Sequence, residues 1–241
     1  GQVMKYLKAF LSEVKSYIIE VFRRLQHACR LFKKRLLPLI VKSKIDLPDD
    51  FIFEEKKSKP RGRKAPNGKY YSHYYEVEFA HIPQSIIEEI RNYNSLLRLY
   101  FGGDYLISQP QVWRNEGLPN EFSDLDIYSQ VWHYDKVVDF RNIQLFTLLS
   151  DTTEAHGAFQ YIRNSSEYQV IGSVLNRDST QLSCGVVDRL TGKRGNSLLF
   201  STGSIPHRAG IPEEGNIRDM FSICFFPAYT NIGINAREIL K

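Results

Sequence analysis

A histidine and an aspartate two residues apart, His133 and Asp135, carry side chains that can bind one metal ion. In an extended strand, side chains repeat every second residue, so these two point to the same face, about 7 Å apart along the chain. His207, much later in the chain, can supply a third ligand. Two imidazoles and one carboxylate make the facial triad of non-haem Fe(II) sites, which leaves positions on the ion open for a bidentate co-substrate and dioxygen. The pattern therefore indicates iron-dependent oxygen chemistry.

Arg218, eleven positions after His207, fits a further requirement of such a site. The stretch between them contains one proline and two glycines, which favour turns, and the apolar run at residues 220–226 that follows is typical of a strand. We therefore expect a hairpin in which His207 ends one strand and Arg218 begins the next. The planar guanidinium would then lie near the ion, where it could bind a distal carboxylate through two hydrogen bonds.

The pair His133 and Asp135 is a weak signal by itself, because a histidine and an aspartate at this spacing often occur by chance. The combination with His207 and Arg218, each in a strand-like context, is more specific. The alternative interpretation is that His133 and His207 are half-buried core histidines whose ring nitrogens are satisfied by hydrogen bonds.

The sequence around these residues resembles the phytanoyl-CoA dioxygenase-like branch of the Fe(II)/2-oxoglutarate oxygenases. The resemblance extends over roughly residues 100–228 and is carried by four blocks, namely residues 132–135 (WHYD), residues 145–159, residues 195–200 (GNSLLF), and His207 with Arg218. It implies a double-stranded β-helix, or jelly roll, whose mouth holds Fe(II). It also implies His133, Asp135 and His207 as the metal ligands, and Arg218 as the residue that binds the carboxylate of the co-substrate 2-oxoglutarate.

Two departures from the family pattern occur, and neither touches a metal ligand. Many members have Pro-Gly-Ser-His where this chain has residues 162–166 (IRNSS), and the family's Gly-Asp before Leu-Leu-Phe is here Gly195-Asn196. The first departure lies where members often shape the substrate pocket, so the resemblance implies no particular substrate. In halogenating relatives the carboxylate ligand is replaced by Ala or Gly, whereas Asp135 keeps it, which favours oxygenation.

Two glutamines are our candidates for a second hydrogen bond to 2-oxoglutarate. Gln130 and Gln144 lie near the ligands in sequence, and an amide can donate to a carboxylate without adding charge. Trp132 and Tyr134 flank His133 and would face the other side of an ideal strand, so we expect them to pack in the core.

The elements needed to position these residues are mostly strands. We expect a helix near residues 83–97, and a long insert at residues 164–194 that could cover the site. Extended runs are expected near residues 105–113, 127–134, 142–149, 159–162, 197–201 and 220–226. Many short strands broken by turn residues favour a sandwich or barrel. The fold class we predict is therefore mainly β, a jelly roll with N-terminal and flanking helices.

Composition sets outer limits on the protein. With 241 residues, 42% of them hydrophobic, the chain can bury one sizeable core. Its three cysteines, Cys29, Cys184 and Cys224, stand far apart, which indicates neither a zinc site nor a disulfide framework and suits a reducing compartment. No run of eighteen apolar residues and no signal peptide is present, so we expect a cytoplasmic protein.

The N-terminal part of the chain is strongly basic. Residues 1–46 contain eleven Lys and Arg but three acidic residues, an excess of eight positive charges where the whole chain has five. Their apolar residues recur at three- and four-residue steps, which predicts an amphipathic helical segment ending before Pro38. We divide the chain into this segment, 1–46, and an oxygenase domain, 47–241. The segment could contact an anionic membrane surface or an acidic partner, or could pack on the jelly roll with a solvated basic face.

A second basic run, residues 56–64, precedes an Asn67-Gly68 pair and several tyrosines. Positive charge with interleaved aromatic residues is typical of single-strand nucleic-acid surfaces. The preferred interpretation is a solvated loop leading into a β-hairpin, because Asn-Gly favours a hairpin turn and tyrosines favour strands.

These observations predict an Fe(II)- and 2-oxoglutarate-dependent dioxygenase that hydroxylates a small or lipid-linked substrate and releases succinate and CO2. One alternative is a nucleic-acid-directed demethylase, whose pattern has paired arginines further beyond the distal histidine than Arg218 stands. We therefore do not expect nucleic acid as a partner. The other alternative is a catalytically silent jelly-roll binding module, which would lack one of the ligands or the arginine. All four residues are present here.

Overall fold

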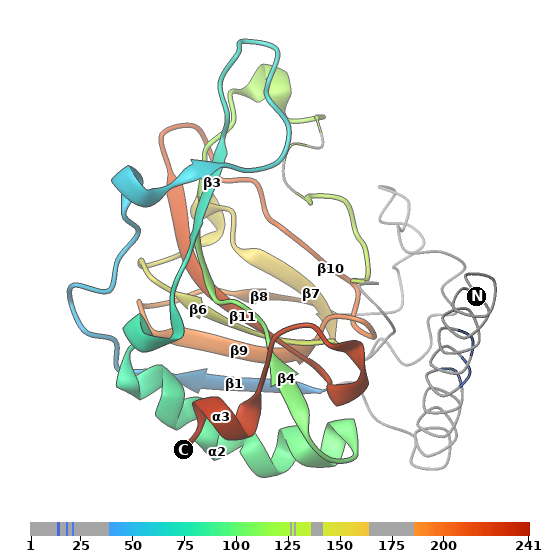
Figure 1. The fold of residues 1–241 in the computed structure, drawn as a ribbon. Helices are drawn as coiled ribbons and strands as arrows, with labels where there is room; N and C mark the ends of the chain where they lie inside the picture. Colours follow the sequence, from blue (N-terminus) through green and yellow to red (C-terminus); the bar gives the residue numbers. More distant parts are fainter. Residues whose placement is uncertain are drawn as a thin grey trace, which may run out of the picture.

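The computed structural model describes residues 39–125, 127, 129–135, 142–163 and 186–241, together with Val14, Ile18 and Val21. Within these ranges most of the regular elements are β-strands, and they form two antiparallel sheets that face each other (Figure 1). The fold class predicted from the sequence is confirmed.

The larger sheet has nine strands. Its main path runs through β1 (Ile40–Lys44), β9 (Asn196–Ser201), β6 (Ile143–Leu148), β11 (Ile217–Pro227), β5 (Gln111–Glu116), β3 (Ser72–Glu76) and β2 (Lys59–Pro60). Strand β4 (Tyr105–Ile107) also pairs with β11, and β12 (Ile234–Asn235) pairs with β4. The smaller sheet contains β10 (His207–Arg208), β7 (Phe159–Arg163) and β8 (Val186–Leu190) in that order.

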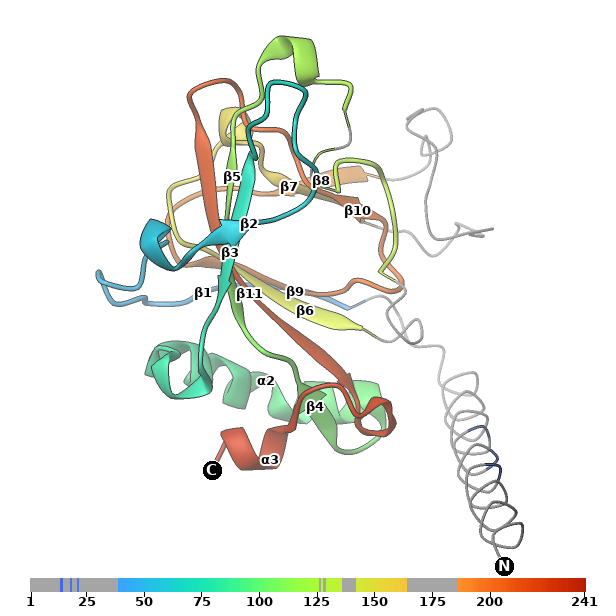
Figure 2. The same ribbon diagram turned by 45° about the horizontal axis from the view of Figure 1, so that its top comes forward.

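The order in which the chain visits the two sheets identifies the jelly roll. After β5 in the large sheet, His133 forms a bridge to β10 of the small sheet. The chain then returns to the large sheet as β6, crosses for β7 and β8, returns as β9, crosses again as β10 and ends in the large sheet as β11. This repeated crossing winds the strands into a double-stranded β-helix, seen from a second direction in Figure 2.

The expected hairpin between His207 and Arg218 is wrong. His207 begins β10, which pairs with β7, whereas Arg218 is the second residue of β11, which pairs with β5 and β6. The turn-rich stretch between them carries the chain from one sheet to the other. Turn residues indicate that the chain changes direction, but they do not specify which strands pair afterwards.

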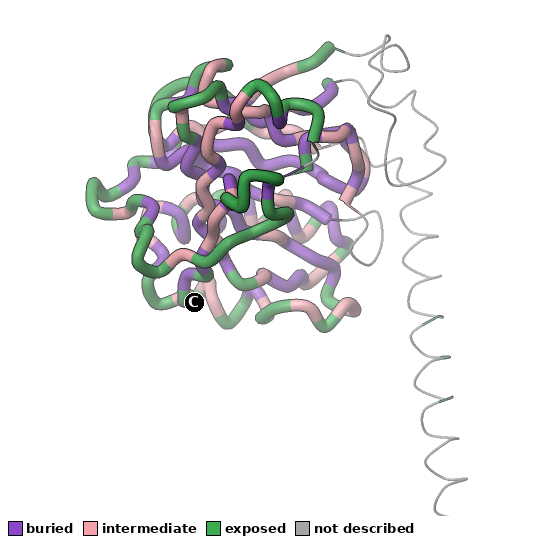
Figure 3. The backbone as a smooth tube through the Cα atoms, turned by 90° about the horizontal axis from the view of Figure 1, so that it is seen from above, coloured by how far each residue is buried: buried purple, intermediate pink, exposed green. Residues whose placement is uncertain are grey.

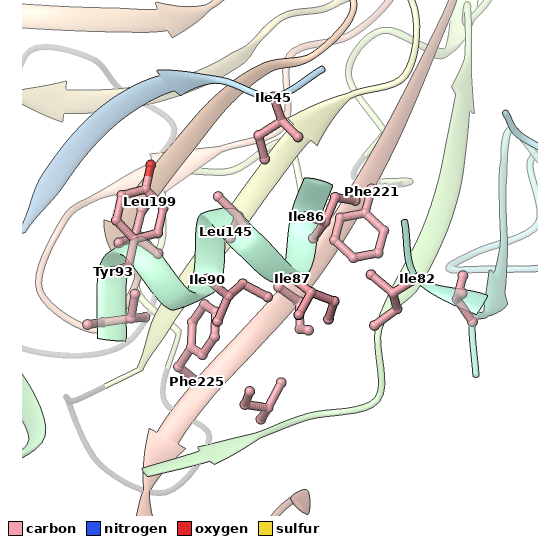
Figure 4. Packing of buried hydrophobic residues seen from close by; sticks show 14 of the residues in the cluster. Ile45, Ile82, Ile86, Ile87, Ile90, Tyr93, Leu145, Leu199, Phe221 and Phe225 are labelled. Carbon is pink, nitrogen blue, oxygen red and sulfur yellow. The ribbon is translucent and has the colours of Figure 1, made fainter. Parts of the chain in front are cut away.

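Helix α2 (Gln84–Phe101) covers the outer face of the large sheet (Figures 1 and 2). The helix predicted near residues 83–97 is thus confirmed, and it continues to Phe101. It ends where Gly102 adopts the left-handed conformation at φ 73°, which glycine takes without steric cost. Its buried face packs on the strands, as Figure 4 shows for Ile86, Ile87, Ile90 and Tyr93 beside Leu145, Leu199, Phe221 and Phe225. A short helix, α3 (Ala236–Ile239), follows β12.

A second apolar cluster lies between the two sheets. Met220 of β11, Phe146 of β6 and Phe200 of β9 meet Phe159 and Tyr161 of β7 there. Because strand side chains alternate between faces, β6 and β11 contribute to both clusters. Buried residues therefore continue through the centre of the chain trace in Figure 3.

Several predicted segments lie partly or wholly outside the described residues. Of the basic segment 1–46, the structure describes Val14, Ile18 and Val21, which are helical and exposed, and residues 39–46, which include β1. Of the insert at residues 164–194, the part from residue 186 onward is described and contains β8, so the insert is shorter than predicted. Of the extended run at residues 127–134, the described part forms one bridge, at His133.

The single extended run expected at residues 105–113 is divided into two strands, β4 and β5. Within the described ranges, no helix combines the length and the apolar character needed to cross a membrane.

Candidate metal centre and its cavity

Backbone hydrogen bonds hold the three predicted ligands beside one another. The N–H of His133 donates to the carbonyl of His207 and the N–H of His207 donates to the carbonyl of His133, both at 3.0 Å. The N–H of Asp135 donates to the carbonyl of Thr202 at 3.1 Å. Residues from two distant parts of the sequence are therefore fixed in one ladder, and the separation of His133 and Asp135 by one residue places both side chains toward His207.

The ligand atoms are close enough to share one ion. The Nε2 atoms of His133 and His207 each lie 3.5 Å from Oδ1 of Asp135, and the three ligand atoms lie within 4.8 Å of one another. An ion about 2.1 Å from each ligand would separate neighbouring ligand atoms by about 3 Å if they occupy adjacent octahedral positions. The observed spacing fits one face of such a coordination shell.

The outer nitrogen of each imidazole is held by a backbone carbonyl. Nδ1 of His133 lies 2.7 Å from the carbonyl oxygen of Val131, and Nδ1 of His207 lies 2.9 Å from that of Ile205. A carbonyl can only accept, so each Nδ1 carries a proton. Each Nε2 faces Asp135, where it can give its lone pair to a metal ion or, while no ion is bound, donate a hydrogen bond to the carboxylate. Backbone partners of this kind orient the imidazoles of metal sites.

The electrostatics of Asp135 favour a ligand that is charged at neutral pH. Burial opposes ionisation of this carboxyl, but hydrogen bonds and charge interactions with the imidazoles of His133 and His207 outweigh burial and hold its pKa below the usual range. An ionised carboxylate is the form that binds a divalent cation.

All three ligands open on a cavity of about 740 Å³, within the usual size range of small-molecule sites. Histidines that serve only to pack a core would not border such a space, so the cavity favours the metal-site interpretation over the core-histidine alternative. One part of its wall is polar and includes Ser72, Ser108, Gln109, Gln111, Gln144 and Ser222. Another part is apolar and includes Phe79, Phe226, Ile232 and Ile234.

The two candidate glutamines occupy different environments. Gln144 lines the cavity from β6. Gln130 does not line it: this residue is buried, its amide oxygen accepts from the N–H of Ile127 at 3.4 Å, and its amide nitrogen donates to the carbonyl of Ser123 at 3.2 Å. These contacts brace the loop that precedes His133, so Gln130 supports the site from behind instead of facing the space where a co-substrate would bind.

Arg218 lies on the inner face of β11 and is 1% exposed, and it is next to the cavity without forming part of its wall. Its guanidinium carbon is 5.8 Å from the ring centroid of Trp113, which does line the cavity. With the Asn115 amide oriented by its neighbours, the Asn115 oxygen accepts from Arg218 Nη2 at 2.6 Å and its nitrogen donates to Ser72 Oγ at 2.9 Å. Nη1 of Arg218 donates to the carbonyl of Gly210 at 3.4 Å. The guanidinium is thus fixed in a buried polar network.

Sequence reasoning missed three residues that the structure brings to this region, namely Arg61, Trp113 and Asn115. Trp113 and Asn115 stand two apart on β5, an alternation that predicts one shared face but not which face. Arg61 belongs to the basic run interpreted as a solvated loop. No local signal distinguishes the one basic residue in that run that turns into the cavity.

No family model matches this sequence, and no curated protein matches it. Solved structures of similar fold do exist. One is the non-haem, α-ketoglutarate-dependent epimerase SnoN from nogalamycin biosynthesis, at 14% identity over 87% of this chain and 74% of that chain, with a TM-score of 0.48. Another is AviO1 from Streptomyces viridochromogenes Tue57, at 12% identity over 78% and 90% of the two chains, with a TM-score of 0.48. HygX from Streptomyces hygroscopicus, with nickel and 2-oxoglutarate bound, is similar at 10% identity over 70% and 74%, with a TM-score of 0.44. Similarity at this level transfers no substrate and no residue role.

Proposed function

We propose that this protein is a non-haem Fe(II)- and 2-oxoglutarate-dependent oxygenase that acts on a small organic molecule. The observation that carries the proposal is the convergence of two imidazole Nε2 atoms on the Asp135 carboxylate, 3.5 Å from each, at the wall of a cavity of about 740 Å³. Two histidines and one carboxylate on one face of an ion leave room for a chelating keto acid and dioxygen, which is the arrangement that Fe(II) oxygenases use.

The residues of the chain have separate tasks in this proposal. His133, Asp135 and His207 hold the ion, and Arg218 binds the distal carboxylate of 2-oxoglutarate. The bound iron and 2-oxoglutarate supply oxidation of a C–H bond, with release of succinate and CO2. Gln144 donates a hydrogen bond to the co-substrate from the cavity wall. Gln130, proposed from sequence for the same task, acts only by bracing the loop before His133.

The role of Arg218 is supported by its fixed position rather than by exposure. Asn115 accepts a hydrogen bond from its Nη2, and the carbonyl of Gly210 accepts one from its Nη1. These two bonds fix the plane of the guanidinium on the inner face of β11. The neighbouring Trp113 is part of the cavity wall, and the guanidinium of Arg218 lies directly behind this ring. Its positive charge is therefore close enough to attract an anion in the cavity. A guanidinium held in this way is preorganised for a carboxylate.

Two finer parts of the proposal depend on the sequence. Assignment to the phytanoyl-CoA dioxygenase-like branch rests on the blocks at residues 132–135 and 195–200. Hydroxylation is proposed as the reaction because Asp135 retains the carboxylate that halogenating relatives replace.

The charge of residues 1–46 supports one further component, contact with an acidic membrane surface or partner. Vesicle flotation with acidic lipid, comparing the full chain with one that begins at Leu39, tests this component and leaves β1 intact. Equal failure of both chains to float with the vesicles would contradict it.

The activity itself is tested by supplying Fe(II), 2-oxoglutarate and oxygen to the purified protein and measuring succinate. We expect succinate that depends on iron and is lost in His133→Ala. His81→Ala is the matched control, because that histidine is exposed and lies outside the site. Equal succinate formation by the His133→Ala protein, or formation that does not require iron, would refute the proposal.

A further inference from the structure

Arg61 reaches the metal cavity from the loop that joins β2 to β3. Its guanidinium carbon lies 5.2 Å from the ring centroid of Trp113 and 5.8 Å from that of Tyr74. Rings at these distances attract the cation and restrict where it can move. The residue is exposed to solvent, yet protein atoms surround its guanidinium closely enough to desolvate it. Both properties are expected of a side chain on the wall of an open cavity.

The backbone around Arg61 is fixed on both sides. The N–H of Arg61 donates to the carbonyl of Ser72 at 2.8 Å, which continues the pairing of β2 with β3. Gly62 follows in the left-handed region, at φ +76°, and a Cβ there would lie 2.5 Å from the carbonyl oxygen of Ile127. Only glycine allows so close an approach, and Ile127 itself lines the cavity. The loop is therefore seated against the cavity, and Arg61 is directed into it.

The charges around the cavity do not balance without another anion. Among the described residues that line it, Arg61 is the only lysine or arginine and Asp135 the only aspartate or glutamate. In the function proposed above, a divalent ion, Asp135, the dianionic 2-oxoglutarate and Arg218 together sum to zero charge. Arg61 then contributes one positive charge that no other residue of the wall offsets.

The surroundings of Arg61 strengthen the attraction of its positive charge for an anion. Desolvation lowers the pKa of Arg61 from its usual value, against electrostatic interactions with Tyr74, Cys224 and Asp135, which raise it. A guanidinium remains protonated at neutral pH despite such a shift. A charged group partly withdrawn from water gains most from a partner that restores the lost hydration with hydrogen bonds.

We propose that Arg61 binds an anionic oxygen group of the substrate, a carboxylate or a phosphate, and so sets which end of the substrate faces the metal. This inference rests on the function proposed above. It narrows the substrate class to small anionic molecules. The apolar part of the wall, formed by Phe79, Phe226 and Ile234, would contact the uncharged portion of the same molecule.

The test uses the full chain with Ni(II) in place of iron and with saturating 2-oxoglutarate, so that the metal and co-substrate positions are filled. Benzoate, phenyl phosphate and benzamide are titrated by ligand-observed NMR. They share a ring, and they differ in carrying a carboxylate, a phosphate or no charge. We expect at least one anion to bind more tightly than benzamide, and the preferred anion identifies the group.

Variants decide whether Arg61 is responsible. Arg61→Gln should weaken binding of the preferred anion by about 10- to 100-fold, as expected for loss of hydrogen bonds to a charged group, and leave benzamide unchanged. Arg61→Lys should give an intermediate result, because it keeps the charge and loses the fork. Arg63→Gln is the matched control: it removes the same charge from the same loop at an exposed residue that does not line the cavity.

Three results would overturn the inference. The first is an Arg61→Gln protein, folded by circular dichroism, that binds the anions as wild type does. The second is equal weakening by Arg63→Gln. The third is anion binding that depends on Arg61 but is seen only when 2-oxoglutarate is omitted and is lost when it is added, which would assign Arg61 to the co-substrate. Failure of the proposed function is distinguishable, since it would appear as a wild-type protein that binds no Ni(II); the same titration without the ion would still decide whether Arg61 binds anions.

Discussion

The two faces of the large sheet use the same strands for opposite purposes. On the face covered by α2, Leu145 and Phe225 belong to a closed apolar core. On the face toward the small sheet, their immediate neighbours Gln144 and Cys224 line the cavity, and these two are register partners across the ladder of β6 and β11. Because side chains alternate along a strand, one ladder can supply stability on one side and a binding site on the other. Changes on the two faces should therefore have separable effects.

The largest effect is expected on the cavity side, from Asp135→Asn. The amide keeps the shape of the side chain but removes the negative charge that Nε2 of both histidines face at 3.5 Å. Loss of a supporting hydrogen bond alone costs metal sites roughly 10- to 100-fold in affinity, so loss of a charged ligand should cost more than that. Metal analysis after dialysis and titration with Ni(II) measure the change.

The thermal stability of the Asp135→Asn protein tests whether the two faces of the sheet act separately. Without added metal, the midpoint of thermal unfolding should fall only slightly, because the α2 core is unchanged and only the interactions of the Asp135 carboxylate with the two imidazoles are lost. A large fall in that midpoint would show that Asp135 holds the fold together, and the separation of the two faces would then be incorrect.

The next effect is expected on the opposite face, from Ile90→Ala. This side chain is 0% exposed between α2 and the sheet, and its truncation leaves a cavity that closely packed neighbours cannot fill. We expect the free energy of unfolding to fall by about 2–5 kcal/mol. Chemical denaturation measures this change, and Leu99→Ala on the exposed face of the same helix is the matched control.

Affinity for Ni(II) supplies the complementary measurement for Ile90→Ala. At a temperature where the variant is fully folded, its metal affinity should equal that of wild type, since Ile90 packs in the core cluster and does not line the cavity. A folded variant with much weaker metal binding would mean that the core and the metal centre are energetically coupled.

A smaller effect, confined to the cavity side, is expected from Asn115→Ala. The Asn115 oxygen accepts from Arg218 Nη2 at 2.6 Å, so its removal costs about 1–3 kcal/mol and releases one end of the guanidinium. The concentration of 2-oxoglutarate needed for half-maximal succinate release should rise while Ni(II) affinity stays constant. An unchanged requirement for 2-oxoglutarate would contradict a role of the Asn115-held Arg218 in binding the co-substrate.

Sequence patterns were most informative for the regular elements themselves. The helix near residues 83–97 was predicted because its apolar residues repeat with the helical period, and β6, β7, β9 and β11 were predicted from short runs rich in apolar residues. The three candidate ligands were predicted as well, and the structure brings them together. The crossing between β10 and β11 was not, because sheet membership depends on contacts distant in sequence.

Arg61 illustrates a second limit of local patterns. Like its neighbours Lys57, Lys59 and Arg63, Arg61 is exposed, as expected in a solvated loop, but of these four residues only Arg61 lines the cavity. Its own direction is set by Gly62 against Ile127 and by the pairing of β2 with β3, and these contacts join parts of the chain that sequence alone does not relate. Residues that shape substrate choice often lie on such loops, where conformation depends on the surrounding scaffold.

The smallest expected effect concerns Cys224, which borders the cavity beside Gln144. Burial and the nearby charge of Asp135 raise the pKa of the Cys224 thiol to about 12, against a hydrogen bond from Ser108 and the charge of Arg61, which lower it. Since the thiolate is the reactive form, iodoacetamide should modify Cys224 slowly at pH 8 in the folded protein and rapidly after denaturation. Mass spectrometry of a Cys29→Ser, Cys184→Ser background measures this single site. Fast modification in the folded state would mean that this part of the wall is a reactive surface, and the polar lining would then offer chemistry of its own beside the metal centre.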